Sequence, residues 1–261
     1  MTLLAADIDN SHTVLGVLEL FGERSEVVAD WRVATDPRRT GDEWAVLLRG
    51  LLGERLDGID GVAVCSTVPA VLQEWRSMLV RHLPERRAVI VEPGVRTGIP
   101  VRTDNPREVG ADRVVNALAA LTAYGGPAIV VDVGGTATTF DVVDAQGHYI
   151  GGAIAPGPEI ALEALRRRGA QLRHVELARP RSVIARNTVE ALQSGMVFGV
   201  ASQIEGLVAR MLAELDIDPA AVSVVATGPF APLVVEECRC FTHHAPWLAL
   251  QGLAEVFARN G

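Results

Sequence analysis

The spacing of apolar and polar residues divides the chain into short strands and amphipathic helices that alternate. Short apolar runs bounded by turn residues predict buried strands, and apolar positions that recur every three or four residues predict helices. The predicted strands are residues 3–8, 13–20, 61–66, 87–92, 128–133 and 221–228, with two more between 140 and 157. The predicted helices are residues 40–52, 68–83, 111–125, 158–168, 187–215, 229–237 and 247–258. The alternation predicts an α/β protein.

One polar segment occurs twice in similar form. The sequence DIDNSHT begins at Asp7, at the end of the first predicted strand, and DVGGTATT begins at Asp132, at the end of a later one. The two segments start 125 residues apart, about half of the 261-residue chain. We therefore predict two similar α/β domains, residues 1–116 and 117–261, with a ligand cleft between them.

The charge composition excludes several classes of function. The net charge is −8 and the longest basic run is the arginine triplet 166–168, so nucleic acid is not expected as the main partner. Lysine is absent, and all 24 basic side chains are arginine. A Walker A phosphate loop and a Schiff-base mechanism are excluded, because both need a lysine amine.

The cysteines and the apolar runs indicate the compartment. Cys65, Cys238 and Cys240 are odd in number, and the last two are too close for a CxxC redox or zinc pair, so reduced thiols in a cytoplasmic protein are expected. The histidines show no metal-ligand spacing. No apolar run reaches 18 residues and no secretory signal pattern opens the chain, so no membrane partner is expected.

The segment from Asp132 to Thr139 is the strongest local candidate for phosphate binding. Gly134 and Gly135 allow the backbone to approach a ligand closely, and successive N–H groups and threonine hydroxyls can donate to phosphate oxygens. The alternative is an ordinary β-turn with threonines on an exposed strand. The strand-to-helix junction at Gly228 could hold an adenosine or a phosphate, but such junctions are common.

A loop of about twenty residues, 94–113, ends in the sequence VGADR where a helix begins. Loops of this length in compact domains are usually functional. Asp112 could accept a proton from a substrate hydroxyl, and Arg113 could pair with a carboxylate. The alternative is that Asp112 caps the helix and Arg113 is its surface partner.

Several long segments, in this order and spacing, resemble type III pantothenate kinases over nearly the whole chain. They are EPGVRTGIPVRTDNPREVGADRVVNALAA, IVVDVGGTATTFDVV, YIGGAIAPG, ARPRSVIARNTVEALQSG and VVATGPFAP. The resemblance implies the actin-like fold, with two ribonuclease H-like domains and an ATP cleft between them. It implies a homodimeric, cytoplasmic transferase that phosphorylates pantothenate at the first step of coenzyme A biosynthesis. The helix at 187–215 is the candidate interface.

The resemblance also implies roles for individual residues. Asp112 would be the general base on the substrate hydroxyl. The pantothenate pocket would contain Gly110, Ala111, Asp112, Arg113 and Thr188. ATP would contact Asp7, Ile8, Asp9, Asn10, Ser11, His12, Thr13 and Thr136. The implied cofactors besides ATP are Mg²⁺, near Asp7, and a monovalent cation, K⁺ or NH₄⁺, on Asp132.

The nucleotide side of the sequence departs from the family pattern at four turns. Asp9 stands in place of a glycine, and an unneutralised carboxylate about 4 Å from a phosphate costs about 4 kcal/mol at an effective dielectric near 20. Gly135 is an additional residue in the second phosphate turn. Arg186 replaces a lysine, and Pro229 replaces a glycine and removes an N–H donor.

Three hypotheses follow from this uneven pattern. The first is an active ATP-dependent pantothenate kinase, which the intact VGADR segment and Thr188 favour. The second is a divergent paralogue that phosphorylates another small alcohol. The third is a catalytically inactive kinase-like protein that binds a metabolite or has a regulatory role, which Asp9 favours.

Overall fold

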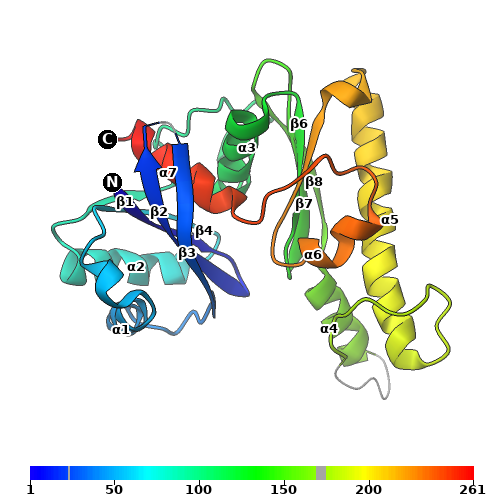
Figure 1. Ribbon diagram of the computed structural model, residues 1–261, viewed down its shortest axis with the longest axis horizontal. Helices are drawn as coiled ribbons and strands as arrows, with labels where there is room; N and C mark the ends of the chain where they lie inside the picture. Colours follow the sequence, from blue (N-terminus) through cyan, green and yellow to red (C-terminus); the bar gives the residue numbers. More distant parts are fainter. Residues whose placement is uncertain (23, 169–174) are drawn as a thin grey trace. The chain divides into compact units, whose positions relative to one another are not determined.

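The computed structural model describes residues 1–22, 24–168 and 175–261, and the chain forms two compact units (Figure 1). The first unit contains Met1–Ile99, Asp104–Ala119 and Trp247–Gly261. The second unit contains Pro100–Thr103 and Ala120–Pro246. Each unit is built around one five-stranded sheet.

The first sheet has its central strand at the N-terminus of the chain. Its strands are β1 (Thr2–Ile8), β2 (His12–Phe21), β3 (Arg24–Ala34), β4 (Gly61–Ser66) and β5 (Arg87–Ile90). Their spatial order is β3-β2-β1-β4-β5. The first three strands are antiparallel neighbours, whereas β4 lies parallel to β1 and β5 parallel to β4.

The second sheet repeats this topology. Its strands are β6 (Ala128–Val133), β7 (Ala137–Val143), β8 (Tyr149–Pro156), β9 (Ser223–Thr227) and β10 (His243–His244). The order β10-β9-β6-β7-β8 is the first order read from the other edge, with the same antiparallel and parallel pairings. The prediction of two similar α/β halves is therefore confirmed.

The α-helices lie close to the predicted positions. They are α1 (Gly41–Leu52), α2 (Pro69–His82), α3 (Ala111–Tyr124), α4 (Pro158–Arg168), α5 (Thr188–Leu215), α6 (Ala231–Val234) and α7 (Leu248–Arg259). Short 3₁₀ turns span Gly53–Leu56, Pro106–Glu108, Pro219–Ala221 and Val235–Glu237. Thr40 caps α1 through a capping box, in which it accepts from the N–H of Glu43 and the Glu43 carboxylate accepts from the N–H of Thr40.

Strand β3 was not predicted from the sequence. It forms the edge of the first sheet, and its residues alternate between exposed and half-buried positions. Ala29, Trp31 and Val33 supply the inner side and pack against the core. The alternation of apolar and polar residues with a period of two could have predicted this strand. Because only one side of the strand is apolar, its sequence contains no continuous apolar run.

The first sheet packs its two faces differently. Leu4, Ile8 and Val64 face a core formed with α1 and α2, which lie along the same side of the sheet in Figure 1. Trp44 of α1 and Trp75 of α2 meet there with ring centroids 5.2 Å apart. This face therefore carries the large side chains.

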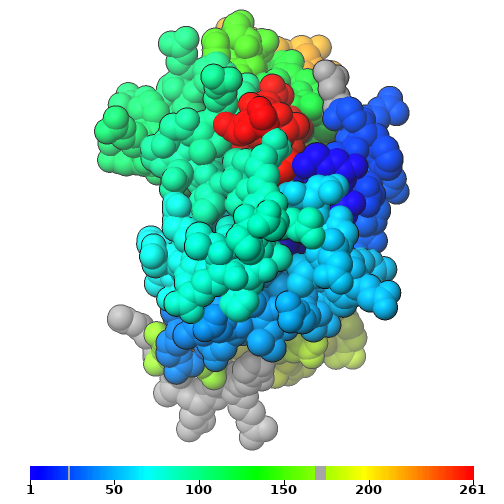
Figure 2. All heavy atoms as spheres, turned by 90° about the vertical axis from the view of Figure 1, so that its left-hand side faces the viewer, coloured from blue at the N-terminus to red at the C-terminus, as the bar shows by residue number. Residues whose placement is uncertain are grey.

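The opposite face of the first sheet carries small residues, and α7 packs against it. A Cβ atom added to Gly61 would lie 2.2 Å from Cζ of Phe257, and one added to Gly16 would lie 2.5 Å from Cδ1 of Leu250. Figure 2 shows the C-terminal residues, in red, among blue and blue-green residues of the same unit. Asn260 links this end to Arg96, with hydrogen bonds of 3.1 Å and 2.9 Å.

The second unit places its core between the sheet and α5. Phe140, Val131 and Val224 of the sheet pack with Val200 and Ile204 of α5. By length and composition alone, α5 is apolar enough to cross a membrane, and 28% of its most apolar window is buried within the protein. The large apolar side chains of α5 are mostly buried or half-buried, and its exposed positions are mainly small or polar residues.

The two compact units follow a different division of the chain from the predicted domains, 1–116 and 117–261. The C-terminal helix α7 belongs to the first unit because it covers the small-residue face of the first sheet. Residues 100–103 belong to the second unit, where Val101 pairs with Tyr149. The compact units do not test where the two similar halves of the chain meet, so the boundary at residues 116 and 117 stays a prediction.

The close approach of α7 predicts opposite effects for two glycine substitutions in helices. A Cβ at Gly252 of α7 would lie 2.3 Å from the carbonyl oxygen of Val115, so Gly252→Ala should lower the free energy of unfolding by about 1–3 kcal/mol. Gly50 of α1 is exposed, and no described atom lies within 4 Å of its Cβ position. Gly50→Ala should raise stability by about 0.5–1 kcal/mol. Urea unfolding checks both, and equal shifts in the two variants would contradict the packing argument.

Candidate active site

The first predicted phosphate segment is a tight hairpin at the end of the central strand β1. Ile8 pairs with Thr13, and the N–H of Asp9 donates to the carbonyl of His12 at 3.0 Å. Asn10 and Ser11 form the tip. The hairpin therefore exposes a short polar loop directly after the buried strand, as the sequence predicted.

Two threonines that sequence reasoning missed hold this hairpin in place. Thr35 follows β3, donates its N–H to the carbonyl of Ser11 at 3.0 Å, and shares a 2.9 Å hydroxyl contact with Thr13. Thr67 follows β4 and donates its N–H to the carbonyl of Ile8 at 3.0 Å. Each threonine follows a strand that neighbours the hairpin, so the strand order was the signal that could have identified them.

Asp9 lies in an environment that favours its neutral form. Burial, and secondarily the charge of Asp112, raise the pKa of Asp9 to about 7. At neutral pH about half of this carboxyl is therefore protonated. The like-charge cost that the sequence predicted beside the phosphates is correspondingly smaller. Arg32 also brings a cation to the hairpin, with Nη2 3.0 Å from Nδ1 of His12.

Asp112 begins the helix α3 in the same unit as the hairpin. The carbonyl of Gly110 accepts the N–H of Val114 at 3.2 Å, and a Cβ on Gly110 would lie 2.4 Å from Oδ1 of Asp112. Burial raises the pKa of Asp112, although the N–H groups of Arg113 and Asp112 oppose this. Within the described residues, buried Oδ1 of Asp112 has no hydrogen-bond partner. An acceptor in this state can take the proton of a substrate hydroxyl.

A buried cysteine lies beside the hairpin as well. The thiol of Cys65 donates to Oδ1 of Asp7 at 3.0 Å. Burial, followed by the charges of Asp7, Asp112 and Asp9, raises the pKa of the Cys65 thiol. The first unit therefore brings Asp7, Asp9, Cys65 and Asp112 into electrostatic contact.

The second phosphate segment forms a hairpin of the same length as the first. Val133 pairs with Thr138 across four residues, just as Ile8 pairs with Thr13. Gly135 is thus no insertion relative to the first hairpin. Its carbonyl accepts the N–H of Ile160 at 3.2 Å at the start of α4, so this helix helps to hold the second hairpin.

The strand-to-helix junction after β9 packs against the second hairpin. Gly228 has a φ of 93°, and a Cβ there would lie 2.2 Å from Oδ1 of Asp132 and 2.7 Å from the nitrogen of Val133. The N–H of Phe230 donates to the carbonyl of Val133 at 3.0 Å. Although Pro229 has no N–H group, the N–H of the next residue links the junction to the second hairpin.

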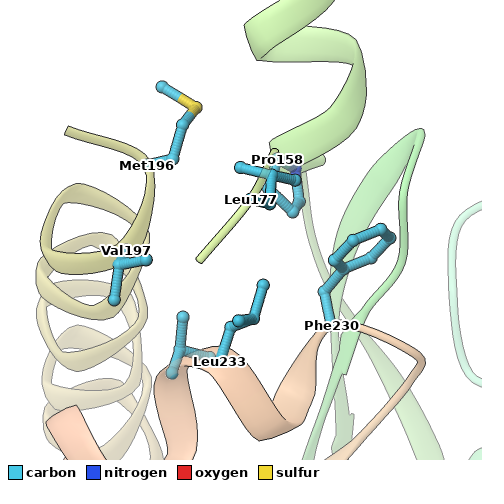
Figure 3. A pocket seen from close by; sticks show the side chains of 7 residues that line it. Pro158, Leu177, Met196, Val197, Phe230 and Leu233 are labelled. Atoms are coloured by element: carbon cyan, nitrogen blue, oxygen red, sulfur yellow. The ribbon is translucent and has the colours of Figure 1, made fainter. Parts of the chain in front are cut away.

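A small apolar pocket adjoins this junction in the second unit (Figure 3). Phe230 and Pro158 form its wall toward the second hairpin, and Met196 and Val197 of α5 close the other side. The remaining lining residues are Leu177, Leu233 and Val234. The aromatic ring of Phe230 separates the pocket from Gly135, because a Cβ on Gly135 would lie 3.2 Å from Cε2 of this ring.

The remaining predicted residues lie in two groups, one in each unit. Gly110, Ala111 and Arg113 accompany Asp112 in the first unit, whereas Thr188, Asp132 and Thr136 belong to the second. Thr188 is the first residue of α5, and the side chain of the preceding Asn187 caps that helix. The roles given to these residues stay predictions.

Comparisons with known proteins identify the relatives of the chain. The type III pantothenate kinase family profile matches residues 3–210. A type III pantothenate kinase of Nocardioides sp. is 69% identical over 260 residues, with 100% of both chains covered. One of Streptomyces coelicolor is 57% identical over 265 residues, with 99% of this chain and 98% of the relative covered.

Among solved structures, the activator of 2-hydroxyisocaproyl-CoA dehydratase from Clostridium difficile, with bound ADPNP, superimposes with a TM-score of 0.55. It is 12% identical, and 99% of this chain and 97% of that chain are covered. At this identity the likeness shows the fold alone.

The repeated sheet topology and the paired hairpins place the chain among the actin-like α/β proteins with two ribonuclease H-like domains. This confirms the predicted fold class. The chain belongs to the type III pantothenate kinase family, a family of ATP-using phosphotransferases, as the sequence motifs predicted.

The junction at Gly228 predicts a site-specific loss of nucleotide binding. Gly228→Ala should displace Asp132 and Val133 and weaken binding of ADPNP with Mg²⁺ at least about tenfold, because the new Cβ meets both. Gly151→Ala is the matched control: its φ of 125° is also unfavourable for alanine, but no described atom lies within 4 Å of its Cβ position. Calorimetry should show weakened binding only for Gly228→Ala. Equal losses of ADPNP affinity in both variants would contradict this prediction and show that backbone strain alone weakens binding.

Proposed function

We propose that this chain transfers the γ-phosphate of ATP to the primary hydroxyl of pantothenate, the first step of coenzyme A biosynthesis. Beyond the family relationship, one observation carries the proposal. Asp112 is a largely buried carboxylate of raised pKa, with an unpartnered Oδ1 among the described residues, near the first phosphate hairpin. A general base for an alcohol needs these properties.

The proposed roles of the residues follow the chemistry of phosphoryl transfer, in which the protein mainly positions groups and neutralises charge. Asp112 accepts the proton of the substrate hydroxyl. Gly110, Ala111, Arg113 and Thr188 hold pantothenate, with the guanidinium of Arg113 suited to its carboxylate. The polar atoms of the first hairpin and Thr136 contact the ATP phosphates.

The donor set near Asp7 fits Mg²⁺ in its usual form at nucleotide sites. Over the described ranges, no group of three or more histidine, cysteine, aspartate or glutamate side chains could hold a metal ion. Mg²⁺ at such sites takes one or two carboxylates, and its other ligands are phosphates and water. We assign Asp7 as the protein carboxylate for Mg²⁺ and Asp132 as the carboxylate for K⁺ or NH₄⁺. When bound, Mg²⁺ neutralises phosphate charge.

The altered nucleotide turns are compatible with an active kinase. Burial raises the pKa of Asp9 to about 7. The second hairpin, which contains Gly135, has the same length as the first. After Pro229, the N–H of Phe230 donates to the carbonyl of Val133. These observations favour the active enzyme over the inactive, regulatory alternative. The identity to curated relatives favours pantothenate over another small alcohol.

Replacement of the proposed base tests the function directly. Asp112→Asn removes the proton acceptor and keeps the shape, so kcat should fall about 10²–10⁴-fold while ADPNP binding is kept. The measurement is ADP release with ATP, Mg²⁺, K⁺ and pantothenate. Asp30→Asn on β3 is the matched control, because Asp30 is an exposed carboxylate of the same unit.

Three outcomes would contradict the proposal. Turnover by the unmodified protein with other alcohols but not with pantothenate would support the paralogue. Absence of ADPNP binding at millimolar concentration would support the inactive protein. Full activity of Asp112→Asn would remove the assigned base.

We also propose that the enzyme is a cytoplasmic homodimer paired through the exposed side of α5. Small exposed residues recur there every three or four positions, at Ala191, Gly195, Gly199, Ser202 and Gly206. No described atom lies within 4 Å of the Cβ position of the three glycines. Such a surface lets a second helix approach closely.

A bulky polar side chain on this surface should separate the copies. Gly199→Gln improves helix propensity, so loss of pairing would not reflect a weaker helix. Light scattering should give twice the chain mass for the unmodified protein and a single mass for Gly199→Gln. Gly50→Gln on α1 is the control and should stay dimeric. A single mass for the unmodified protein would refute the proposed interface.

A further inference from the structure

We infer that Cys65 is a positioning residue for Asp7, whose thiol fixes the orientation of the carboxylate that receives the magnesium–nucleotide complex. The inference rests on the proposed function, because Asp7 would bind a magnesium–nucleotide complex only if the protein is an ATP-dependent kinase. Cys65 itself touches neither substrate nor metal in this proposal. Its effect passes entirely through one hydrogen bond.

The strand register places the two side chains next to each other. Asp7 on β1 and Cys65 on β4 are direct partners in a parallel pair, so both side chains point to the same face of the sheet. The thiol reaches Oδ1 of Asp7 at 3.0 Å. Asp7 is 9% exposed and Cys65 is 0% exposed, so water competes little for this bond.

The packing around Cys65 restricts its movement. Residues of β4 on this face alternate through Gly61, Ala63 and Cys65, all small and fully buried or nearly so. The ring of Phe257 on α7 occupies the space above Gly61. Because the Cys65 side chain is fully buried, the surrounding packing restricts its rotamers and so limits the directions in which the thiol can donate.

The second half of the chain carries the same pair of groups. Asp132 is the counterpart of Asp7 in the repeated topology, and its direct partner on the parallel strand β9 is Thr227. Thr227 is 4% exposed and, like cysteine, has a hydrogen-bond donor attached to Cβ. An apolar residue would pack equally well at a buried strand end. The recurrence of a side chain with a donor on Cβ beside each acid favours a role for the donor at Cys65 over a role in packing alone.

Loss of this donor should act on the orientation of Asp7 alone. The backbone of Asp7 is bonded on both sides, because β1 is the central strand between β2 and β4. The two side-chain torsions are set by side-chain contacts, and the bond from the thiol is one of the contacts that constrain them. A thiol is a weak donor, so the expected effect is severalfold rather than orders of magnitude.

The test compares substitutions that differ by one hydroxyl. Cys65→Ser keeps a donor on Cβ and Cys65→Ala removes it at nearly the same volume. Calorimetry with ADPNP and Mg²⁺ should show about threefold to tenfold weaker binding for Cys65→Ala and less than about twofold change for Cys65→Ser. The Mg²⁺ concentration for half-maximal activity should rise only in Cys65→Ala, and KM for pantothenate should stay constant.

A second buried cysteine provides the matched control. Cys238 belongs to the second unit, and its thiol contacts the carbonyl of Ala201 at 3.7 Å. Cys238→Ala and Cys238→Ser should change stability without changing the Mg²⁺ dependence. If Cys65→Ala does not fold, the isosteric pair Cys65→Thr and Cys65→Val repeats the comparison with and without a hydroxyl.

Equal binding by the serine and alanine variants would overturn the inference and assign Cys65 to packing. A double-mutant cycle sharpens this: in an Asp7→Asn background, Cys65→Ala should have little further effect on ADPNP binding. Additive effects would also overturn the inference. Because these readouts use ADPNP binding, they stay decisive if the preferred alcohol proves not to be pantothenate. Failure of the proposed function is thus distinguishable from failure of the inference.

Discussion

The central strand of each sheet is the constraint on which the rest of the structure depends. Strands β1 and β6 are hydrogen-bonded on both sides, and each has an aspartate as its penultimate residue and is followed by a four-residue hairpin loop. A strand bonded on both edges cannot slip by one residue without turning its buried side chains outward. The register therefore fixes the positions of Asp7 and Asp132, and the hairpins, the threonine contacts and the neighbouring donors are all arranged around these two ends.

The proposed phosphate site in the first unit is surrounded by acidic side chains, although basic groups are usual at sites that bind anions. Three aspartates interact near the first hairpin, where bound phosphates would add further negative charge. Burial raises the pKa of Asp9 to about 7, which reduces this charge at neutral pH, and it also raises the pKa of Asp112, which makes this carboxylate a better proton acceptor. The same burial thus lowers a repulsion and prepares a catalytic group, so the acidic cluster is consistent with kinase chemistry.

The sequence predicted most helices, the repeated hairpins and the family, because these depend on local periodicity and on motifs contiguous along the chain. It missed β3, whose inner face is lined only by partly buried residues such as Trp31 and Val33. It treated Cys65 only as a reduced thiol, since its contact with Asp7 depends on strand register 58 residues away. It also contained no sign that α7 packs on Gly16 and Gly61, the contacts by which this helix belongs to the first compact unit. Long-range contacts of this kind leave no local pattern.

The position of α7 has a consequence for the folding of the protein during translation. The first sheet is synthesised early, but the face on which α7 packs stays uncovered until residues 248–259 have been synthesised. During that interval the second unit is completed first, although its strands come later in the chain. The order in which the two sheets are synthesised and the order in which the two units are completed are therefore reversed, and the first unit is the one whose apolar face waits longer for its cover.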